Sequence, residues 1–309
     1  MKHICFYYYH INIIGGVEIA ILNLISRLHT KYKITVAFDK DNSSLDFLLR
    51  LSKYADIVNI SKERLECDTL VICSLYGSYR NIKAKKKIRW LHANLKEIKY
   101  KLDREQDIED YVVVSEECGK QLQESNGADY KLIYNLLDKD ILDKANEEVD
   151  VVDKPLKLVT VARISPEKGF ERMLKFANIL KQRKIDYVWY VIGKGNDDFN
   201  KGYEDNIKKR SPKQFIYLGK LDNPFPYMKQ CDFLVQLSNY ESQGLVVVEA
   251  LTIGTPVIIT NYKVATETVD DKVNGYIVDM ELTNVPELKP LKFKYEYKTN
   301  IEEWEKILW

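Results

Sequence analysis

The sequence predicts an α/β protein made of two doubly wound domains, each built around a mostly parallel sheet. Short apolar runs alternate with amphipathic stretches along nearly all of its 309 residues, which is the pattern of repeated strand–helix units. The length also exceeds that of a typical single domain, which favours two domains. A polar stretch at residues 138–155 interrupts the alternation once, and we interpret it as a link between two halves of about 150 residues. We expect domains at residues 1–145 and 146–290, with a C-terminal helix in 291–309 that packs back on the first domain.

Each short apolar run is interpreted as a strand. Continuous runs such as Val112-Val113-Val114 suit strands that are buried on both faces of a parallel sheet. The strands expected in the first domain are His3–Tyr8, Ile34–Phe38, Thr69–Cys73, Ile88–Leu91, Tyr111–Val114 and Leu132–Tyr134. Those expected in the second are Leu156–Ala162, Tyr187–Ile192, Phe215–Leu218, Phe233–Leu237, Val257–Thr260 and Gly275–Val278.

Two amphipathic helices are predicted by apolar residues that recur at intervals of three and four. The first follows Gly15-Gly16 and carries its stripe on Val17, Ala20, Ile21, Leu24 and Leu28. The second carries Phe170, Met173, Leu174, Ala177 and Leu180.

Composition excludes several classes of function. Lys and Arg number 47 against 46 Asp and Glu, so the chain lacks the basic surplus of a nucleic-acid binder. The five cysteines are odd in number and scattered, which is typical of reduced thiols. The four histidines form no zinc motif, and we expect no metal site. Residues 11–25 are apolar but interrupted by Asn12, Glu18 and Asn23, so we expect neither a signal peptide nor a membrane span. We therefore expect a cytoplasmic protein.

The stretch from Asn239 to Pro256 is the most informative part of the sequence. It lies between two expected strands and ends in Gly254-Thr255-Pro256, which is a helix stop. Three consecutive valines could also form a strand, but the flanking strands and the stop favour a buried helix.

Two glutamates in this stretch carry the chemistry. Glu249 would be a carboxylate within an apolar helix, so it needs hydrogen-bond donors, either from a ligand's vicinal hydroxyls or from a buried Arg or Lys. Glu241 precedes the helix, where it either enters a cleft or caps the helix. The amides of Ser242, Gln243, Gly244 and Leu245 would form a helix N-terminus suited to phosphate.

Two glutamates separated by seven residues, framed by a strand and by Gly-Thr-Pro-Val, resemble the signature of family 4 glycosyltransferases of the group 1 type. These enzymes are retaining, use nucleotide-sugar donors and have the GT-B fold, in which two Rossmann-like domains face each other across a cleft. The resemblance covers most of the chain. It implies that Glu249 holds the ribose hydroxyls and that Glu241 orients the donor sugar.

Other segments resemble the family in the same order. Val161 to Gly169 matches the turn whose Arg and Lys hold the donor diphosphate, which assigns that role to Arg163 and Lys168, although a solvated charged turn stays open. Gly15-Gly16 matches a strand-to-helix turn that lets the donor approach the backbone. His92, at the end of an expected strand, matches a histidine that reaches the donor sugar, and a structural role for it also stays open.

The sequence departs from the family pattern at Gln243, where the family commonly has an aromatic residue, and this leaves the accepted sugar open. The chain is also short for the family. The Asp-x-Asp at residues 138–140 is interpreted as a helix cap and not as a metal motif.

Charge is concentrated in one segment. Residues 80–101 contain nine basic residues and one acid, which gives 9 − 1 = +8. The acidic run at 103–110 could partly neutralise this charge. Two interpretations stay open for the segment, a patch that docks on an anionic membrane surface and a solvated face.

The resemblance implies a retaining hexosyltransferase that moves a sugar from a nucleotide diphosphate, most simply a UDP-sugar, to an acceptor hydroxyl. We expect no other cofactor, and a glycan or lipid-linked acceptor in bacterial surface polysaccharide assembly. No covalent nucleophile is evident, which favours front-face displacement. Two alternatives stay open: a nucleotide-sugar epimerase on the same fold, and a non-catalytic partner subunit.

Overall fold

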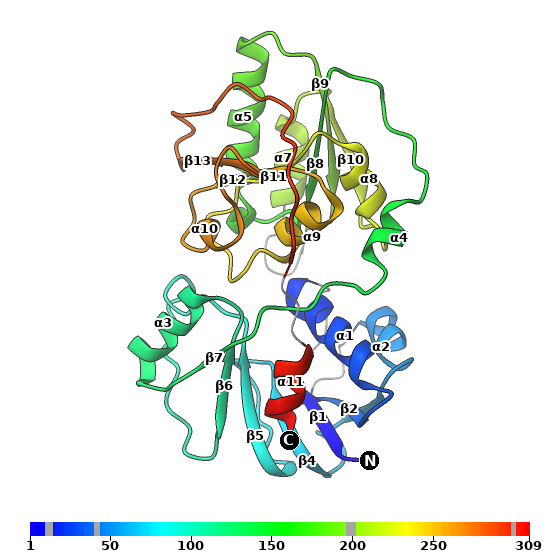
Figure 1. Cartoon of the computed structure of the whole chain (residues 1–309), viewed down its shortest axis with the longest axis vertical. Coiled ribbons are helices and arrows are strands. Elements are labelled where there is room, and N and C mark those ends of the chain that lie inside the picture. The colour runs from blue at the N-terminus through cyan, green and yellow to red at the C-terminus, as the bar shows by residue number, and fades with distance from the viewer. Residues whose placement is uncertain (10–14, 40–43, 196–201, 298–300) are drawn as a thin grey trace. The chain divides into compact units, whose positions relative to one another are not determined.

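The computed structural model describes residues 1–309 except 10–14, 40–43, 196–201 and 298–300. The chain divides into two compact units (Figure 1), Met1–Asp138 with Lys298–Trp309 and Lys139–Tyr297, which we call unit 1 and unit 2. The sequence had led us to expect boundaries between residues 145 and 146 and between residues 290 and 291. Within the described residues, no helix combines the length and the apolar character that crossing a membrane requires.

Unit 1 is built around a seven-stranded, fully parallel sheet of order β3-β2-β1-β4-β5-β6-β7. Its strands are β1 (His3–Tyr7), β2 (Lys33–Phe38), β3 (Asp56–Asn59), β4 (Leu65–Ile72), β5 (Ile82–Leu91), β6 (Asp110–Val113) and β7 (Lys131–Leu132). Its helices are α1 (Gly16–Leu28), α2 (Leu45–Leu51), α3 (Glu116–Asn126) and α11 (Ile301–Leu308).

The helix α11 is part of unit 1 although it ends the chain. Its Trp304 is fully buried in the core of this unit, and its last carbonyls accept from Thr69 of β4 (3.2 Å) and Lys86 of β5 (2.6 Å). In Figure 1 it lies beside the strands of this sheet. The helix expected in residues 291–309 therefore occupies only Ile301–Leu308.

Unit 2 contains a six-stranded parallel sheet of order β10-β9-β8-β11-β12-β13. Its strands are β8 (Leu156–Val161), β9 (Tyr187–Ile192), β10 (Phe215–Gly219), β11 (Phe233–Gln236), β12 (Val257–Thr260) and β13 (Gly275–Val278). Its helices are α4 (Ile141–Ala145), η1 (Pro166–Lys168), α5 (Phe170–Gln182), α7 (Tyr203–Arg210), α8 (Phe225–Gln230), α9 (Leu245–Ile253) and α10 (Ala265–Thr268).

Both faces of the second sheet are buried, as its continuous apolar runs predict. Leu158 packs into one hydrophobic cluster and its neighbour Val159 into another, because successive strand residues point to opposite faces. The predicted pair of parallel-sheet α/β domains is thus confirmed.

Two local features differ from the sequence predictions. The strand β3 was not predicted, because it is a partly exposed edge strand with only two apolar residues, Ile57 and Val58. The stretch 138–155 is not simply a link, since Ile141 and Ala145 lie one helical turn apart in α4 and are buried in a cluster of unit 2. Asp140 stands at the N-cap position of α4, but its side chain does not make the capping hydrogen bond that the interpretation of Asp138-Lys139-Asp140 implies.

Ion pairs neutralise most of the basic segment 80–101. Six of its nine cations pair with acids outside the segment, and three of those acids belong to the run at 103–110. The pairs are Lys83–Glu66, Lys85–Asp68, Lys86–Asp110, Lys87–Asp107, Arg89–Glu105 and Lys96–Glu124. The charge of +8 counted along the sequence therefore overstates the net charge of the surface that this segment forms.

Candidate active site

The strand order of unit 2 creates a natural ligand site. From β8 the chain moves to β9 and β10 on one side, and it then returns to place β11 on the other side of β8. The loops after β8 and β11 consequently leave the sheet in opposite directions at its carboxyl edge, which is where open parallel sheets bind ligands. Lys168 follows β8 and Glu241 follows β11, so the two predicted residues meet at this switch point.

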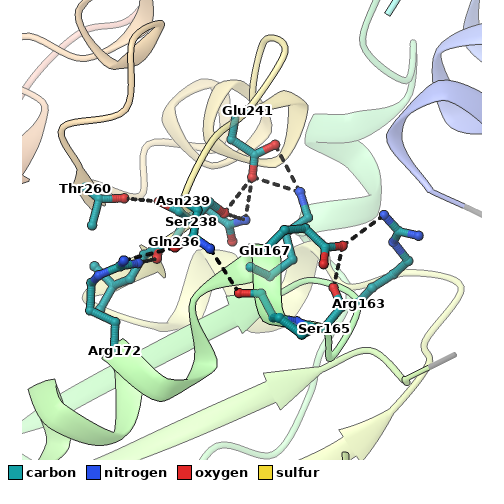
Figure 2. A network of polar contacts seen from close by, with 12 residues as sticks. Arg163, Ser165, Glu167, Arg172, Gln236, Ser238, Asn239, Glu241 and Thr260 are labelled. Carbon is teal, nitrogen blue, oxygen red and sulfur yellow. Dashed lines mark hydrogen bonds and ion pairs between the residues drawn. The ribbon is translucent and has the colours of Figure 1, made fainter. Parts of the chain in front are cut away.

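Glu241 is the centre of a hydrogen-bond network (Figure 2). The ammonium group of Lys168 donates to both of its carboxylate oxygens, at 2.9 and 3.0 Å. Its Oε1 also accepts from the Ser238 hydroxyl at 2.7 Å and from the Gln236 amide at 2.9 Å. The side chain is only 11% exposed, and these donors satisfy a carboxylate that burial would otherwise penalise.

These contacts fix the ionisation of Glu241. Burial alone would raise its pKa, but the charge of Lys168 and the hydrogen bonds from Lys168, Ser238 and Gln236 outweigh burial and hold the pKa below its ordinary value. Glu241 is therefore a carboxylate at neutral pH.

Arg163 lies at the edge of the same network. Its guanidinium contacts Oε1 of Glu167 at 3.3 Å, and Ser165 donates to that same oxygen at 2.6 Å. The backbone carbonyl of Glu167 in turn accepts from the amide of Asn239 at 2.8 Å, which ties the β8 loop to the β11 loop. The Arg163 side chain is 42% exposed, so its donors remain accessible to an anion.

Gly169 allows the two loops to approach closely. Its φ is +73°, and a Cβ atom there would lie 1.8 Å from the carbonyl oxygen of Leu237 at the end of β11. Only glycine fits this contact. Arg172, in the first turn of α5, donates to the same carbonyl, to the carbonyl of Met280 (2.7 Å) and to Oδ1 of Asn239 (2.9 Å).

The loop after Glu241 leads into α9 as predicted. Gly244 is the N-cap residue, with φ +80°, and the helix runs from Leu245 to Ile253. Glu249 lies in the middle of this helix and is 8% exposed. Gln243, which replaces the aromatic residue of the family pattern, is buried and donates to the hydroxyl of Tyr297 at 2.6 Å.

The remaining predicted residues belong to unit 1. Gly15 is the N-cap residue of α1, and its amide donates to the Glu18 carboxylate at 2.8 Å. Glu18 thus occupies the Gly15 amide, and the role of Gly15 and Gly16 in donor binding stays a prediction. A Cβ at Gly16 would meet no described residue within 4 Å, so the described part of the chain gives no packing reason for glycine there.

His92 follows β5 and lines a cavity of about 160 Å³ together with Tyr8, Val17 and Trp90. Its ring centroid lies 4.2 Å from that of Trp90. Burial lowers the pKa of His92 to about 3, so its imidazole is neutral at physiological pH.

The structure thus brings Arg163, Lys168 and Glu241 together in unit 2, with Ser242 to Leu245 in the adjoining loop. Sequence reasoning missed Arg172, Gln236 and Ser238. The available signal was the polar pair Gln236 and Ser238 at the end of an otherwise apolar strand. Across the described ranges, no three Asp, Glu, His or Cys side chains gather as metal ligands.

The fold places the chain in a known class. Anabaena HepE, solved in complex with UDP and glucose, superposes with a TM-score of 0.72 over 92% of this chain and 88% of its own, at 16% identity. Two Rossmann-like units with parallel sheets of this kind define the GT-B fold, and the predicted GT-B fold is confirmed.

One part of the chain matches a family model. Residues 143–288 match the model of glycosyl transferases group 1, and this match includes every residue of the network around Glu241. This part of the chain is therefore similar to the group 1 glycosyl transferases, as the resemblance predicted.

Curated relatives agree with this assignment. The chain is 30% identical over 163 residues to an uncharacterized 41.2 kDa protein in the cps region of Klebsiella pneumoniae, and over 145 residues to the O-antigen biosynthesis glycosyltransferase WclY of Escherichia coli. These alignments cover 50% and 45% of this chain. They span 42% and 39% of the relatives, which is less than half of either protein's length.

Proposed function

We propose that the chain is a retaining glycosyltransferase that moves a hexose from a nucleotide-diphosphate donor, a UDP-sugar, to an acceptor hydroxyl. The observation that carries the proposal is the buried pair of Lys168 and Glu241, held at the carboxyl edge of β8 and β11 within the part of the chain that matches the family. A cation and an oriented carboxylate at a switch point suit a donor that is both anionic and polyhydroxylated.

In this mechanism the diphosphate is the leaving group, and its negative charge grows as the glycosidic bond breaks. Arg163, Lys168 and the amides of residues 242–245 would stabilise that charge from fixed positions. Lys168 has three N–H donors and directs two of them to Glu241, so one remains for a phosphate oxygen. Glu249 would bind the ribose hydroxyls.

Glu241 would orient the donor sugar and stabilise the positive charge of an oxocarbenium-like transition state. Its lowered pKa supports this role, because the group stays ionised throughout the reaction. His92 would contribute a neutral imidazole that hydrogen-bonds a sugar hydroxyl. We propose front-face displacement, with the departing phosphate taking the proton of the acceptor hydroxyl.

The proposed acceptor is a lipid-linked glycan of a bacterial surface polysaccharide. The names of the relatives, an O-antigen glycosyltransferase and a protein of a cps region, support this class. A docking contact with anionic lipid at residues 80–101 is part of the proposal and now depends on Arg80, Lys99 and Lys101, which the structure leaves outside the ion pairs of this segment.

A thermal-shift screen of the full chain against UDP, GDP and ADP tests the nucleotide requirement. A ligand at 100 times its Kd stabilises the folded state by about 2.7 kcal/mol, so UDP should raise Tm clearly. Arg163→Ala should weaken that rise, whereas Arg210→Ala, which removes an exposed cation of α7, should not. The absence of a shift with every nucleotide would contradict the proposal.

Turnover of a UDP-sugar then decides the reaction type. NMR of the product should show the anomeric configuration of the donor. A product with the inverted configuration would refute the retaining mechanism but not the sugar transfer itself. Incubation without acceptor separates the epimerase alternative, because an epimerase changes the sugar while it stays bound to the nucleotide.

A further inference from the structure

Unit 1 contains a second cavity, distinct from the one that His92 lines. It has a volume of about 240 Å³ and lies near the carboxyl ends of β1, β4 and β5. The aromatic and charged residues of its lining that matter here are Tyr7, Tyr76, Tyr79, Tyr100, Arg89 and Glu105. The two cavities share Ser74, Leu75, Tyr76 and Arg89, so they are neighbours separated by one wall.

Tyrosine rings dominate this cavity and hold one another in place. Tyr76, which is 58% exposed, meets Tyr100 edge to face with ring centroids 5.6 Å apart, and Tyr100 is anchored by a hydrogen bond to the Leu75 carbonyl at 3.1 Å. Tyr7 and Tyr79 form a second edge-to-face pair at 6.2 Å. Rigid aromatic rings with polar tips suit a ligand that is apolar on its faces and polar at its edge.

The charged groups of the cavity balance. Arg89 is 5% exposed and donates to Oε2 of Glu105 at 2.8 and 2.5 Å and to the Ser74 carbonyl at 2.9 Å. Tyr79 donates to Oε1 of the same Glu105 at 3.1 Å. Among the described residues of the lining, the cations Arg89 and Lys101 are matched by Asp103 and Glu105, so these residues offer an anionic ligand no surplus of positive charge.

We propose that this cavity binds one neutral sugar ring of the acceptor. The inference rests on the proposed function and specifies its acceptor side. A pyranose ring offers C–H faces that pack on tyrosine rings and hydroxyls that bond with the Arg89–Glu105 pair and the tyrosine hydroxyls. The volume suits a single ring, because it is below the range of about 300–1,000 Å³ that larger ligands need.

The tyrosine hydroxyls keep their protons under all physiological conditions. Burial, and then the charge of Glu105, raise the pKa of Tyr79 to about 12. Burial and the hydrogen bond to Asp39 raise the pKa of Tyr7 further. Both groups are therefore neutral hydroxyls that match the chemistry of a sugar.

Saturation-transfer NMR on the full chain tests the proposal. The probes are the methyl glycosides of glucose, galactose, N-acetylglucosamine and glucuronate, with UDP measured in parallel. At least one neutral glycoside should receive saturation, and Tyr76→Ala should weaken its binding about tenfold, the effect of losing one aromatic contact of about 1.4 kcal/mol. The matched control is Tyr54→Ala, which removes a partly buried tyrosine of unit 1 that lines neither cavity and should leave binding unchanged.

Three results would overturn the proposal: no neutral glycoside binds while UDP does, only the glucuronide binds, or Tyr76→Ala binds the neutral glycoside as the wild type does. Tyr76 is exposed, so its replacement should leave the fold intact, and unchanged UDP binding by this variant verifies that. Failure of UDP to bind the wild-type chain would instead contradict the proposed function, whatever the glycosides do.

Discussion

The ammonium nitrogen of Lys168 lies 2.9 Å from one carboxylate oxygen of Glu241 and 3.0 Å from the other. The two residues are 73 positions apart in sequence and follow adjacent strands of one parallel sheet. Both side chains are at most one-fifth exposed, so the pair interacts in an environment where water screens it weakly. Several consequences of this arrangement, and of the packing around it, can be measured.

Lys168→Met should destabilise unit 2 and abolish donor turnover. The substitution leaves the buried carboxylate of Glu241 without its cation, which costs on the order of 3 kcal/mol. It also removes the group that we assign to the diphosphate. Urea unfolding and nucleotide release measure the two effects separately.

The control is the double variant Lys168→Met with Glu241→Gln. Because it removes both charges, it should recover much of the lost stability while remaining inactive. If the double variant is no more stable than Lys168→Met alone, the ion pair does not explain the burial of Glu241.

Gly169→Ala should be far more damaging than Gly202→Ala. Both glycines have positive φ, +73° and +74°, so both substitutions incur a similar backbone strain of about 1–2 kcal/mol. At Gly169 the added Cβ would also lie 1.8 Å from the Leu237 carbonyl, whereas at Gly202 it meets no described residue within 4 Å. We expect Gly169→Ala to lose at least about 2 kcal/mol more, measured as the difference in urea midpoints. Equal losses would show that the loops after β8 and β11 are not in close contact.

His92 should make the folded state less stable in mild acid. Burial lowers its pKa from 6.5 to about 3, so between these values the unfolded chain binds a proton that the folded chain does not. The unfolding free energy should thus fall with decreasing pH in this window, by up to about 1.4 kcal/mol per pH unit. His92→Gln should reduce the slope of stability between pH 6.5 and pH 4.5. An unchanged slope in this variant contradicts the assignment of a neutral buried imidazole.

Trp304→Ala should destabilise unit 1 and disturb His92. The ring of Trp304 lies 4.6 Å from that of Trp90, which in turn lies 4.2 Å from the ring of His92. Removing a fully buried tryptophan costs about 3–5 kcal/mol. Trp309→Ala, at a position that is 77% exposed and carries one cation–π contact with Lys2, should cost about 1 kcal/mol or less. Thermal unfolding of the two variants should differ accordingly, and a similar Tm would rule out a structural role for α11.

Reversal of Arg80, Lys99 and Lys101 should abolish binding to anionic vesicles. These cations lie outside the six ion pairs of the segment, and each contributes roughly 1 kcal/mol near an anionic surface. The matched control reverses Lys83 and Lys85, which are already paired with Glu66 and Asp68. Co-sedimentation that responds to neither set of changes would refute docking through this segment.

Much of the fold could be predicted because its signals are local. Apolar runs such as Val112-Val113-Val114 mark strands, and the stop at Gly254 marks the end of α9 within neighbouring residues. The strand β3 escaped prediction because an edge strand needs little apolar surface.

The site was only partly predictable, for a physical reason. Lys168 and Glu241 stand in recognisable motifs, but the donors that hold Glu241 come from Gln236 and Ser238, whose role depends on how β11 ends. The contact of Gln243 with Tyr297 joins residues 54 positions apart. Likewise, the acids that neutralise Lys83 and Lys85 lie on the neighbouring strand β4, so counting charge along the sequence could not reveal them.

The most direct test of the central claim is release of UDP from UDP-glucose and related UDP-sugars by the wild-type chain, Glu241→Gln and Arg163→Ala, with Arg210→Ala as control. We expect the wild type and the control to release UDP in the presence of an acceptor. Each site variant should be slower by a factor of about 100, as expected when one group that stabilises transition-state charge is lost. Full activity in both Glu241→Gln and Arg163→Ala would contradict the account.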